Sequence, residues 1–374
     1  MESVRRSVYP GGMLAALVCA LALLEPGMLS SLKHVLAQGE ATEIDVTVPD
    51  AFVQSGTLPV YELIKRDFAD VVQPEWFDGS GVVKKENLSK RGRYDHYTFA
   101  DEDELSVSGE KDGYIYYAAK EGVAQTVNDD GSIARYPANE RTVQTESMAM
   151  DVFWGYMDDP TGGAPVCEEL AFVTLDGARA CVEDMLDKLG VTGYECIWVL
   201  GLDAEAIRAL NAQRNTRIET GRLYTSEIYD FGALTERDEG YALVYRARVD
   251  GVETWGSFMD LRAFVSGDGL RSFSLSAPYA LGDIIMRPDE LITPQEAAAL
   301  LPASVRKSRV PSLEQQMGAV TRAELIYSFD PQARGSELRL LPAWRLHLRF
   351  ADHEEEGIAY VSAVDGTVLD APWK

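Results

Sequence analysis

The sequence predicts an α+β protein in which an N-terminal β-rich domain is followed by two related units, each a helix packed on an antiparallel sheet. Two observations lead to this prediction. A helical pattern followed by alternating strands occurs twice, with helix starts at Thr174 and Thr293. The stretch "AFVSGDGLRSFSL" (263–275) also returns as "AYVSAVDGTVLDA" (359–371). The two copies lie too far apart for a solenoid, whose repeats span roughly 20–50 residues, so a duplicated domain is expected.

Each copy contains an Asp-Gly pair, Asp268-Gly269 in the first and Asp365-Gly366 in the second. Asp-Gly is typical of a tight hairpin turn, because both central residues of that turn need positive φ. The second copy has one more residue before its turn. A bulge must absorb this residue, since strand side chains alternate with a period of two.

Composition indicates a folded, acidic protein. Of the 374 residues, 46% are hydrophobic and 25% charged, as in globular domains, and the net charge is −25. No basic cluster interrupts the acidic excess, so nucleic acid is excluded as a partner. The excess favours solubility, and it leaves a basic partner or a divalent cation as alternatives.

Residues 1–37 are predicted to be a signal peptide or membrane anchor. Arg5 and Arg6 precede the apolar run Met13–Leu24, which is shorter than the roughly 20 residues that span a bilayer. Val35-Leu36-Ala37 suits signal peptidase, which would leave a mature start at Gln38; an uncleaved anchor is the alternative. Either way the protein is expected to be extracytoplasmic, secreted or held at the outer face of the cytoplasmic membrane, with no other membrane contact.

The cysteines outside that segment are Cys167, Cys181 and Cys196. Three cysteines allow at most one internal disulfide, and isolated thiols are favoured, although the sequence leaves open whether any two are bridged. No C-x-x-C pair or neighbouring histidine indicates a metal centre.

Residues 38–157 are expected to form the β-rich domain. Residues 43–48 alternate in polarity, and the runs 104–110 and 114–119 flank Lys111-Asp112-Gly113 as a hairpin. The exception is Val60–Val72, whose apolar spacing predicts a short helix. Two prolines and two glycines then mark residues 158–165 as a linker.

The first α+β unit is placed at 166–290. It is predicted to contain a helix from Thr174 to Gly190, a buried strand at 193–200, a second helix capped by Asp203, and a meander with a tight turn at Asp250-Gly251.

The second unit is placed at 291–374. It opens with a capping box, Thr293-Pro294-Gln295-Glu296, and Leu300 and Leu301 are expected on the buried face of its helix. The predicted partners of that face in the following strands are Trp344, Leu346, Leu348, Tyr360 and Val364. His347 falls on the polar face, where substitution is expected to leave stability unchanged.

These last motifs carry a family resemblance. Thr293-Pro294-x-Glu296-Ala297, "LLPAWRL" and "AYVSAVDGTVL" resemble the PepSY-like domain, a helix on a small antiparallel sheet. The chain is similar to uncharacterised exported proteins of Gram-positive bacteria and, more distantly, to extracytoplasmic regulators of sensor histidine kinases. The resemblance covers Thr174 to the C-terminus and implies binding or regulation in the cell envelope.

The sequence assigns no catalytic, cofactor-binding or metal-binding residue. "DHEEEG" (352–357) lacks the second histidine of a helical zinc pair, and His96 faces away from Asp95. The acidic runs Asp101–Leu105 and Asn128–Ser132 are calcium-ligand candidates or solvated loops. The aromatic runs "YIYY" (114–117) and "VFWGY" (152–156) are recognition surfaces or core.

The function expected from these observations is non-enzymatic binding without a cofactor, with regulation of an envelope protein or peptidase as its most concrete form. The alternative is a structural component of the envelope, and a hydrolase is disfavoured because no nucleophile with an evident base is present. The identity of the partner and the oligomeric state stay open.

Overall fold

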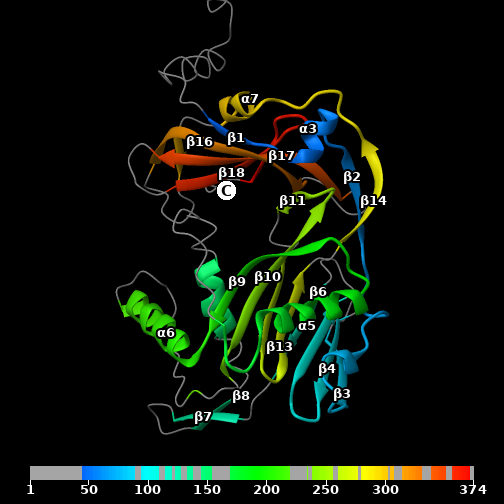
Figure 1. Cartoon of the computed structure of the whole chain (residues 1–374), viewed down its shortest axis with the longest axis vertical. Coiled ribbons are helices and arrows are strands. Elements are labelled where there is room, and N and C mark those ends of the chain that lie inside the picture. The colour runs from blue at the N-terminus through cyan, green and yellow to red at the C-terminus, as the bar shows by residue number, and fades with distance from the viewer. Residues whose placement is uncertain are drawn as a thin grey trace, which may run out of the picture. The chain divides into compact units, whose positions relative to one another are not determined.

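The computed structural model describes residues 44–88, 94–108, 114–119, 123–127, 133–137, 145–153, 169–219, 234, 238–255, 260–276, 279–301, 304–306, 314–330, 338–350 and 356–370 (Figure 1). The predicted signal, the linker 158–165, Cys167, Asn128–Ser132 and residues 352–355 lie outside these residues. Contacts divide the chain into two compact units. One contains Val48–Leu291 and Leu325–Ala343, and is called the central unit below. The other contains Ile292–Glu324 and Trp344–Lys374 with the chain up to Thr47, and is called the terminal unit.

The fold is mostly β, so the predicted fold class of two helix-on-sheet units behind a separate β domain is wrong. The central unit contains one open antiparallel sheet, in which the strands pair in the order β3, β4, β5, β6, β13, β12, β10, β9. Their bounds are β3 Val82–Asn87, β4 Tyr94–Phe99, β5 Glu104–Ser108, β6 Tyr114–Ala118, β9 Tyr194–Leu202, β10 Gly240–Val249, β12 Asp260–Ser266 and β13 Gly269–Ser276.

The pairing of β6 with β13 is the reason for this correction. Ser272 lies opposite Ala118 and Ser276 opposite Tyr114, so the two strands run side by side along their whole shared length. The predicted hairpin of β5 and β6 does form, but it continues the sheet of the meander instead of building a domain of its own. A second small sheet pairs β7 (Val123–Val127) with β8 (Ile133–Pro137).

One face of the large sheet is covered by α5 (Leu175–Lys188), the helix predicted from Thr174 to Gly190. The Thr174 hydroxyl accepts a hydrogen bond from the Gly177 N–H at 3.1 Å, and Gly190 takes positive φ (62°) just beyond the helix. Figure 1 shows α5 lying across the strands. The buried helix residues pack with sheet residues in one core: Ala178, Val182, Met185, Leu186, Leu105, Tyr117, Leu243, Leu261 and Phe273.

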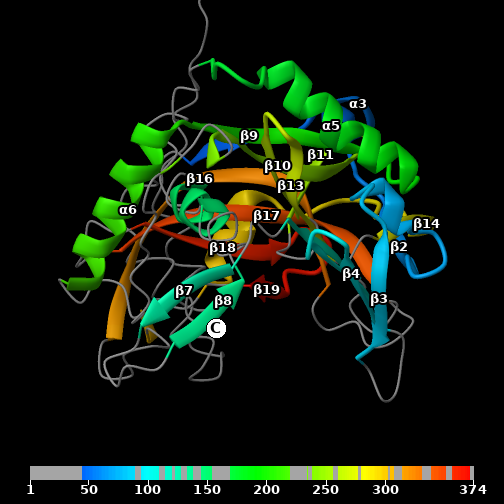
Figure 2. The same ribbon diagram turned by 90° about the horizontal axis from the view of Figure 1, so that it is seen from below.

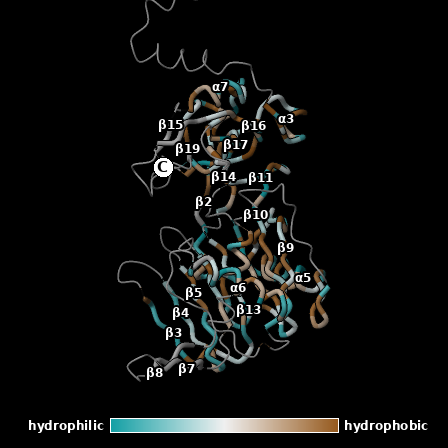
Figure 3. The backbone as a smooth tube through the Cα atoms, turned by 90° about the vertical axis from the view of Figure 1, so that its left-hand side faces the viewer, coloured by the Kyte–Doolittle hydropathy of each residue, from teal (hydrophilic) through white to brown (hydrophobic). Residues whose placement is uncertain are grey.

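Among the described residues, the apolar part of the opposite face lies over β9, β10 and β12. There Trp198, Val244 and Phe264 pack against the helical segment 145–153 and against α6 (Ala204–Glu219). Figure 2 shows α5 and α6 as separate helices of the unit, and Figure 3 shows brown and teal segments interleaved along its strands. The predicted cap of α6 forms, because the Asp203 carboxylate accepts from the Ala206 N–H at 2.7 Å.

The tight turn after β10 has the predicted chemistry. Asp250 (φ 53°) and Gly251 (φ 76°) both take positive φ, as a two-residue Asp-Gly hairpin requires, and β11 (Val252–Trp255) returns against β10.

Residues Val60–Lys65 form strand β2, so the helix predicted at Val60–Val72 is wrong. β2 pairs with β14 (Tyr279–Met286), and its Glu62 and Tyr61 lie opposite Arg339 and Leu340 of β17. The apolar residues whose spacing indicated a helix belong partly to strand β2 and partly to the segment that follows it. Leu63 is a buried residue of strand β2. Phe68 and Val72 follow the end of the strand and are buried in the core as well.

The terminal unit contains the short helix α7 (Pro294–Ala299) with its predicted capping box. The Thr293 N–H donates to Glu296 Oε2 at 2.7 Å, and the Glu296 N–H donates to Thr293 Oγ1 at 3.2 Å. Its strands lie in β1 (Asp45–Thr47), β15 (Ser304–Arg306), β16 (Glu314–Phe329), β17 (Arg339–Phe350), β18 (Glu356–Ser362) and β19 (Val368–Asp370), of which β16 and β17 continue into the central unit. β1 runs parallel to β16, with Val46 opposite Ala323.

Most of the core predicted for this region is confirmed. Trp344, Leu346, Leu348 and Tyr360 are buried, and the Trp344 indole donates to the Ile292 carbonyl at 2.8 Å. Leu301 is buried too, but Leu300 is 52% exposed, because α7 ends at Ala299 and the chain turns there. Val364 lies half-buried in the turn after β18.

The two repeated stretches form hairpins with a shared bulge, one in each unit. The predicted Asp-Gly turn geometry is wrong for both, because Gly269 and Gly366 take positive φ but Asp268 and Asp365 do not. In both, the register shifts directly after the aromatic residue, between Phe264 and Val265 and between Tyr360 and Val361. The following serine accepts backbone N–H bonds of the turn, Ser266 from Asp268 and Ser362 from Asp365. The bulge therefore occupies the same place in each hairpin, although the hairpins belong to different sheets.

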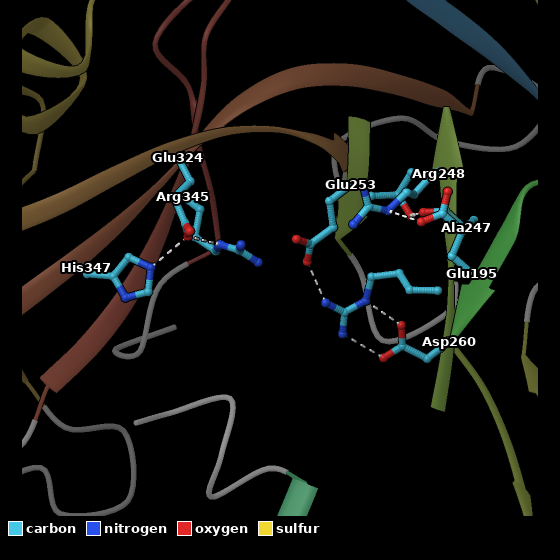
Figure 4. Close-up of polar contacts among 10 residues, drawn as sticks. Glu195, Ala247, Arg248, Glu253, Asp260, Glu324, Arg345 and His347 are labelled. Atoms are coloured by element: carbon cyan, nitrogen blue, oxygen red, sulfur yellow. Dashed lines mark hydrogen bonds and ion pairs between the residues drawn. The ribbon is translucent and has the colours of Figure 1, made fainter. Parts of the chain in front are cut away.

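A buried ion cluster joins β10, β11 and β12. The Arg246 side chain is 1% exposed; its Nε and Nη2 donate to Asp260 at 2.8 and 3.1 Å, and its Nη1 donates to Glu253 at 2.7 Å. Its guanidinium also lies 5.0 Å from the centre of the Trp255 ring. Figure 4 shows the Asp260 and Glu253 carboxylates with these bonds.

We expect Asp260→Ala to lower the free energy of unfolding by about 3–5 kcal/mol, because it leaves a buried guanidinium without its bidentate partner. Urea denaturation measures this change. Arg248→Ala is the matched control: the Arg248–Glu195 pair is exposed (36% and 58%), so its loss should cost less than about 1 kcal/mol. Equal costs for both variants would contradict this interpretation of the cluster.

No helix among the residues that the structure describes is both long and apolar enough to cross a membrane.

Candidate functional site

The half of the sheet face that β4, β5, β6 and β13 form, opposite α5, is polar. In register across these strands and β12 lie His96, Ser106, Tyr116, Ser274 and Arg262, each directly opposite the next. Their neighbours in the sequence point to the α5 core, since side chains alternate along a strand. As far as the described residues go, the apolar cluster of this face does not extend onto β4, β5 or β6. We call this set, with Tyr94, Glu104, Tyr114, Glu146 and Ser272, the polar face.

One end of the polar face places a serine beside a histidine. His96 Nδ1 and Ser106 Oγ form a hydrogen bond of 3.0 Å, and His96 Nε2 lies 3.8 Å from Glu104 Oε1. Asp95 points to the other face, as predicted, and pairs with Lys85 at 3.0 Å. The sequence did not indicate the neighbourhood of Ser106 and His96, because it depends on the register of β4 and β5.

In the part of the chain that the structure describes, the backbone beside this triad does not form an oxyanion site. Ser106 is buried, and β5 is an inner strand whose backbone N–H groups pair with β4 and β6. They are therefore not available to stabilise an oxyanion beside the hydroxyl, which is the largest single contribution in acyl transfer.

Tyrosines line the middle of the face. The rings of Tyr94 and Tyr114 lie 5.6 Å apart, and the Tyr114 hydroxyl donates to the Tyr94 oxygen. Burial and this hydrogen bond raise the pKa of Tyr114. In the predicted aromatic run 114–117, Tyr114 and Tyr116 therefore belong to the polar face, whereas Ile115 and Tyr117 belong to the core.

The inner end of the face is acidic. Burial raises the pKa of Glu146, while the Ser272 hydroxyl and the Arg262 charge act in the opposite direction. Burial, with the nearby charges of Glu146 and Glu104, raises the pKa of Tyr116 to about 12. Tyr116 thus keeps its proton at neutral pH and can donate a hydrogen bond to a ligand.

The acidic run Asp101–Leu105, predicted as a calcium-ligand candidate or a solvated loop, contributes to a cluster of carboxylates. Asp78, Asp101 and Asp103 each place an oxygen within 4.8 Å of the others. Two of these carboxylates already accept hydrogen bonds within the protein. Asp103 accepts one from the Tyr117 hydroxyl at 2.6 Å, and Asp78 accepts one from the Ser80 N–H at 2.8 Å. These three side chains could hold a divalent cation through oxygen atoms.

Ionisation of Asp78 in this cluster should lower the free energy of unfolding. Burial raises the pKa of Asp78, the Ser80 hydrogen bonds lower it, and Asp101 raises it again, with a net increase. The protonated form is therefore favoured by folding, and its stabilising contribution is lost as pH rises through the folded pKa.

We expect Asp78→Asn to stabilise the protein slightly at pH 7, by less than about 1 kcal/mol, because the amide mimics the protonated acid. The gain should disappear at about pH 3, which is below the ordinary pKa of an aspartate, because the pKa of Asp78 is raised above that ordinary value and Asp78 is then protonated itself. Urea denaturation at the two pH values measures it, in calcium-free buffer. A destabilised variant at pH 7 would show that the carboxylate is needed there.

His347 is buried (5% exposed), so the prediction that it lies on a dispensable polar face is wrong. The alternation along β17 is as predicted, but this face is covered as well. His347 Nε2 lies 2.9 Å from Glu324 Oε2, and Arg345 Nε donates to the same oxygen at 2.6 Å (Figure 4). Burial opposes ionisation of Glu324, but His347, Arg345 and Arg322 outweigh it and lower the pKa of Glu324 to about 2.

We expect Glu324 to stabilise the terminal unit above pH about 4 and to lose that contribution, about 1–3 kcal/mol, as pH falls toward 2. His347→Ala should cost about 1–3 kcal/mol at pH 7, because it removes a hydrogen bond from a largely buried carboxylate. Denaturation between pH 7 and 2 measures both effects. Glu324→Gln is the control, and its free energy of unfolding should decrease less than that of the parent chain between about pH 4 and about pH 2. An equal decrease in both proteins would contradict the assignment.

Two of the three cysteines outside the signal segment lie in the described part of the chain. Cys181 and Cys196 are free and partly buried, and burial raises the pKa of both thiols. They are therefore weak nucleophiles.

No family model matches this chain, and no curated protein matches it. Among solved structures, an uncharacterised protein from Eubacterium rectale is similar with a TM-score of 0.46 and 10% identity, over 84% of this chain and 86% of that chain. The Bacillus megaterium YpeB C-terminal domain is a weaker neighbour, with a TM-score of 0.28 and 9% identity, over 83% of this chain and 97% of that chain. Neither description names an enzyme.

Proposed function

We propose that this chain is an exported, non-enzymatic binding protein that regulates a protein or peptidase of the cell envelope. The observation that carries the proposal is the polar face, on which tyrosines and ionisable groups occupy half of a sheet that is otherwise packed with apolar side chains. Such a face stabilises the fold less than apolar packing would. Its composition is that of a recognition surface.

The side chains of the polar face suit recognition of another protein. Tyrosine and arginine are enriched among the residues that dominate binding energy, because they combine a large contact area with hydrogen-bond donors. Tyr114, Tyr116 and Arg262 are half-buried, so they lose little conformational entropy on binding. Glu104 and His96 add polar groups at one edge.

Two features of the sequence, the N-terminal signal pattern and the PepSY-like motifs, support the regulatory form of the proposal. Residues 1–37 have the pattern of a signal peptide or anchor, which directs the protein to the envelope. The motifs from Thr293 to Leu369 resemble PepSY-like domains of exported proteins from Gram-positive bacteria. A structural component of the envelope is the second candidate, which the same export signal and the acidic, soluble composition favour.

The test is a pull-down from envelope extracts with the full exported chain. We expect one stoichiometric protein partner, and loss of at least tenfold in affinity on Tyr116→Ala or Arg262→Gln, because hot-spot residues contribute about 2 kcal/mol or more. Arg208→Gln on exposed α6 is the control and should bind normally.

Melting curves of the variants separate loss of binding from unfolding. Broad retention by cell wall, unaffected by substitutions in the polar face, would overturn regulation in favour of the structural role. Retained partner binding in a folded Tyr116→Ala, Arg262→Gln double variant would remove the polar face from the proposal.

A further inference from the structure

The helical segment 145–153 covers the apolar part of the sheet face, and its buried side carries a carboxylate. Glu146, Ala149, Met150 and Phe153 are all buried, and their spacing places them on one face of the helix. The last three are apolar and belong to the cluster that packs on the sheet. Glu146 therefore occupies a position at which the helical pattern favours an apolar side chain.

Polar groups from four strands act on Glu146 or on its neighbour Tyr116. The Ser272 hydroxyl of β13 and the Arg262 guanidinium of β12 act to lower the pKa of Glu146, but burial outweighs both and the pKa is raised. Glu146 in turn acts on the Tyr116 hydroxyl of β6, as does Glu104 of β5. The ionised form of Glu146 is thus less stable in the folded chain than in water.

Two sheet side chains under the segment are buried with unsatisfied polar atoms, as far as the described residues go. The Ser272 hydroxyl lies beside the Glu146 carboxylate but does not meet it in hydrogen-bond geometry. The Trp198 indole N–H has no hydrogen-bond partner either. Buried polar groups without hydrogen bonds lower the stability of a packed state. The polar atoms of this interface therefore oppose docking of the segment.

Apolar contacts hold the segment on the sheet. The ring of Phe153 lies 5.4 Å from that of Trp198 in an edge-to-face arrangement, and Met148 packs in the same cluster as Val244. These contacts do not change with pH, whereas the charge of Glu146 does.

The raised pKa of Glu146 fixes the direction of the pH effect. Protonated Glu146 packs as a neutral group, and burial opposes its ionisation. Its contribution to docking is fully present below the ordinary pKa of a glutamate. The contribution is lost as pH rises through the raised pKa of the folded chain.

We propose that the segment 145–153 is a releasable cover of the sheet, which stays docked while Glu146 is protonated and detaches when Glu146 ionises. Detachment uncovers Trp198, Val244 and Phe264. Phe264 lies directly opposite Ser272, so the uncovered apolar area borders the polar face. This proposal goes beyond the function proposed above and does not depend on it.

The experiment measures hydrogen exchange of the full chain by mass spectrometry at two pH values, about 5 and about 9, with rates corrected for the chemical effect of pH. We expect the segment to exchange at least about tenfold faster at the higher pH, because each unit by which a pKa is raised changes the docking equilibrium tenfold. Glu146→Gln stays neutral, so its segment should be equally protected at both values. Helix α5 should stay protected throughout, which shows that the opening is local.

Asp151→Asn is the matched control, because Asp151 is the other acid of the segment and is exposed. This variant should keep the pH dependence of the parent chain. Arg262→Gln removes the cation that favours ionised Glu146, so detachment should shift to higher pH. The shift in Arg262→Gln carries the test if Glu146→Gln does not fold, which loss of α5 protection would reveal.

Three results would overturn the proposal. The first is equal protection of the segment at both pH values in the parent chain. The second is a pH dependence that persists in folded Glu146→Gln. The third is simultaneous loss of protection in the segment and in α5 of the parent chain, which would show unfolding of the whole unit instead of release.

Discussion

The central unit depends on the pairing of β6 with β13. This pairing joins the hairpin of β5 and β6 to the meander of β10, β12 and β13, and it places Tyr117 opposite Phe273 and Ile115 opposite Leu275 on the α5 face. Because strand side chains alternate, the same register puts Tyr116 opposite Ser274 and Tyr114 opposite Ser276 on the other face. A shift of one residue would bury the tyrosine hydroxyls under α5 and expose the core. Core and polar face are therefore consequences of one register.

Elements specified by nearby residues were predictable from the sequence. The caps at Thr174, Asp203 and Thr293 and the turn at Asp250-Gly251 depend on side chains within four positions, and the structure contains each of them. The fold class was not predictable in this way, because it depends on β6 meeting β13 across a long stretch of chain. Periodicity also failed at Val60–Val72, where apolar residues of a strand and of the following turn together imitate a helical spacing.

The candidate site shows the same limit. Alternation correctly placed Asp95 and His96 on opposite faces, but the partner of His96 is Ser106, which only the register of β4 and β5 selects. For His347, alternation identified the polar side of β17 but not that this side is covered, so the hydrogen bond with Glu324 was missed. Sequence patterns report which residues share a face. What covers that face depends on tertiary packing, which local patterns do not encode.

The polar face of the central unit is stabilised by its own side chains. On the polar face, hydroxyl and charged groups bond with one another across strands, as His96 does with Ser106 and Tyr114 with Tyr94, so the face is stable without a partner.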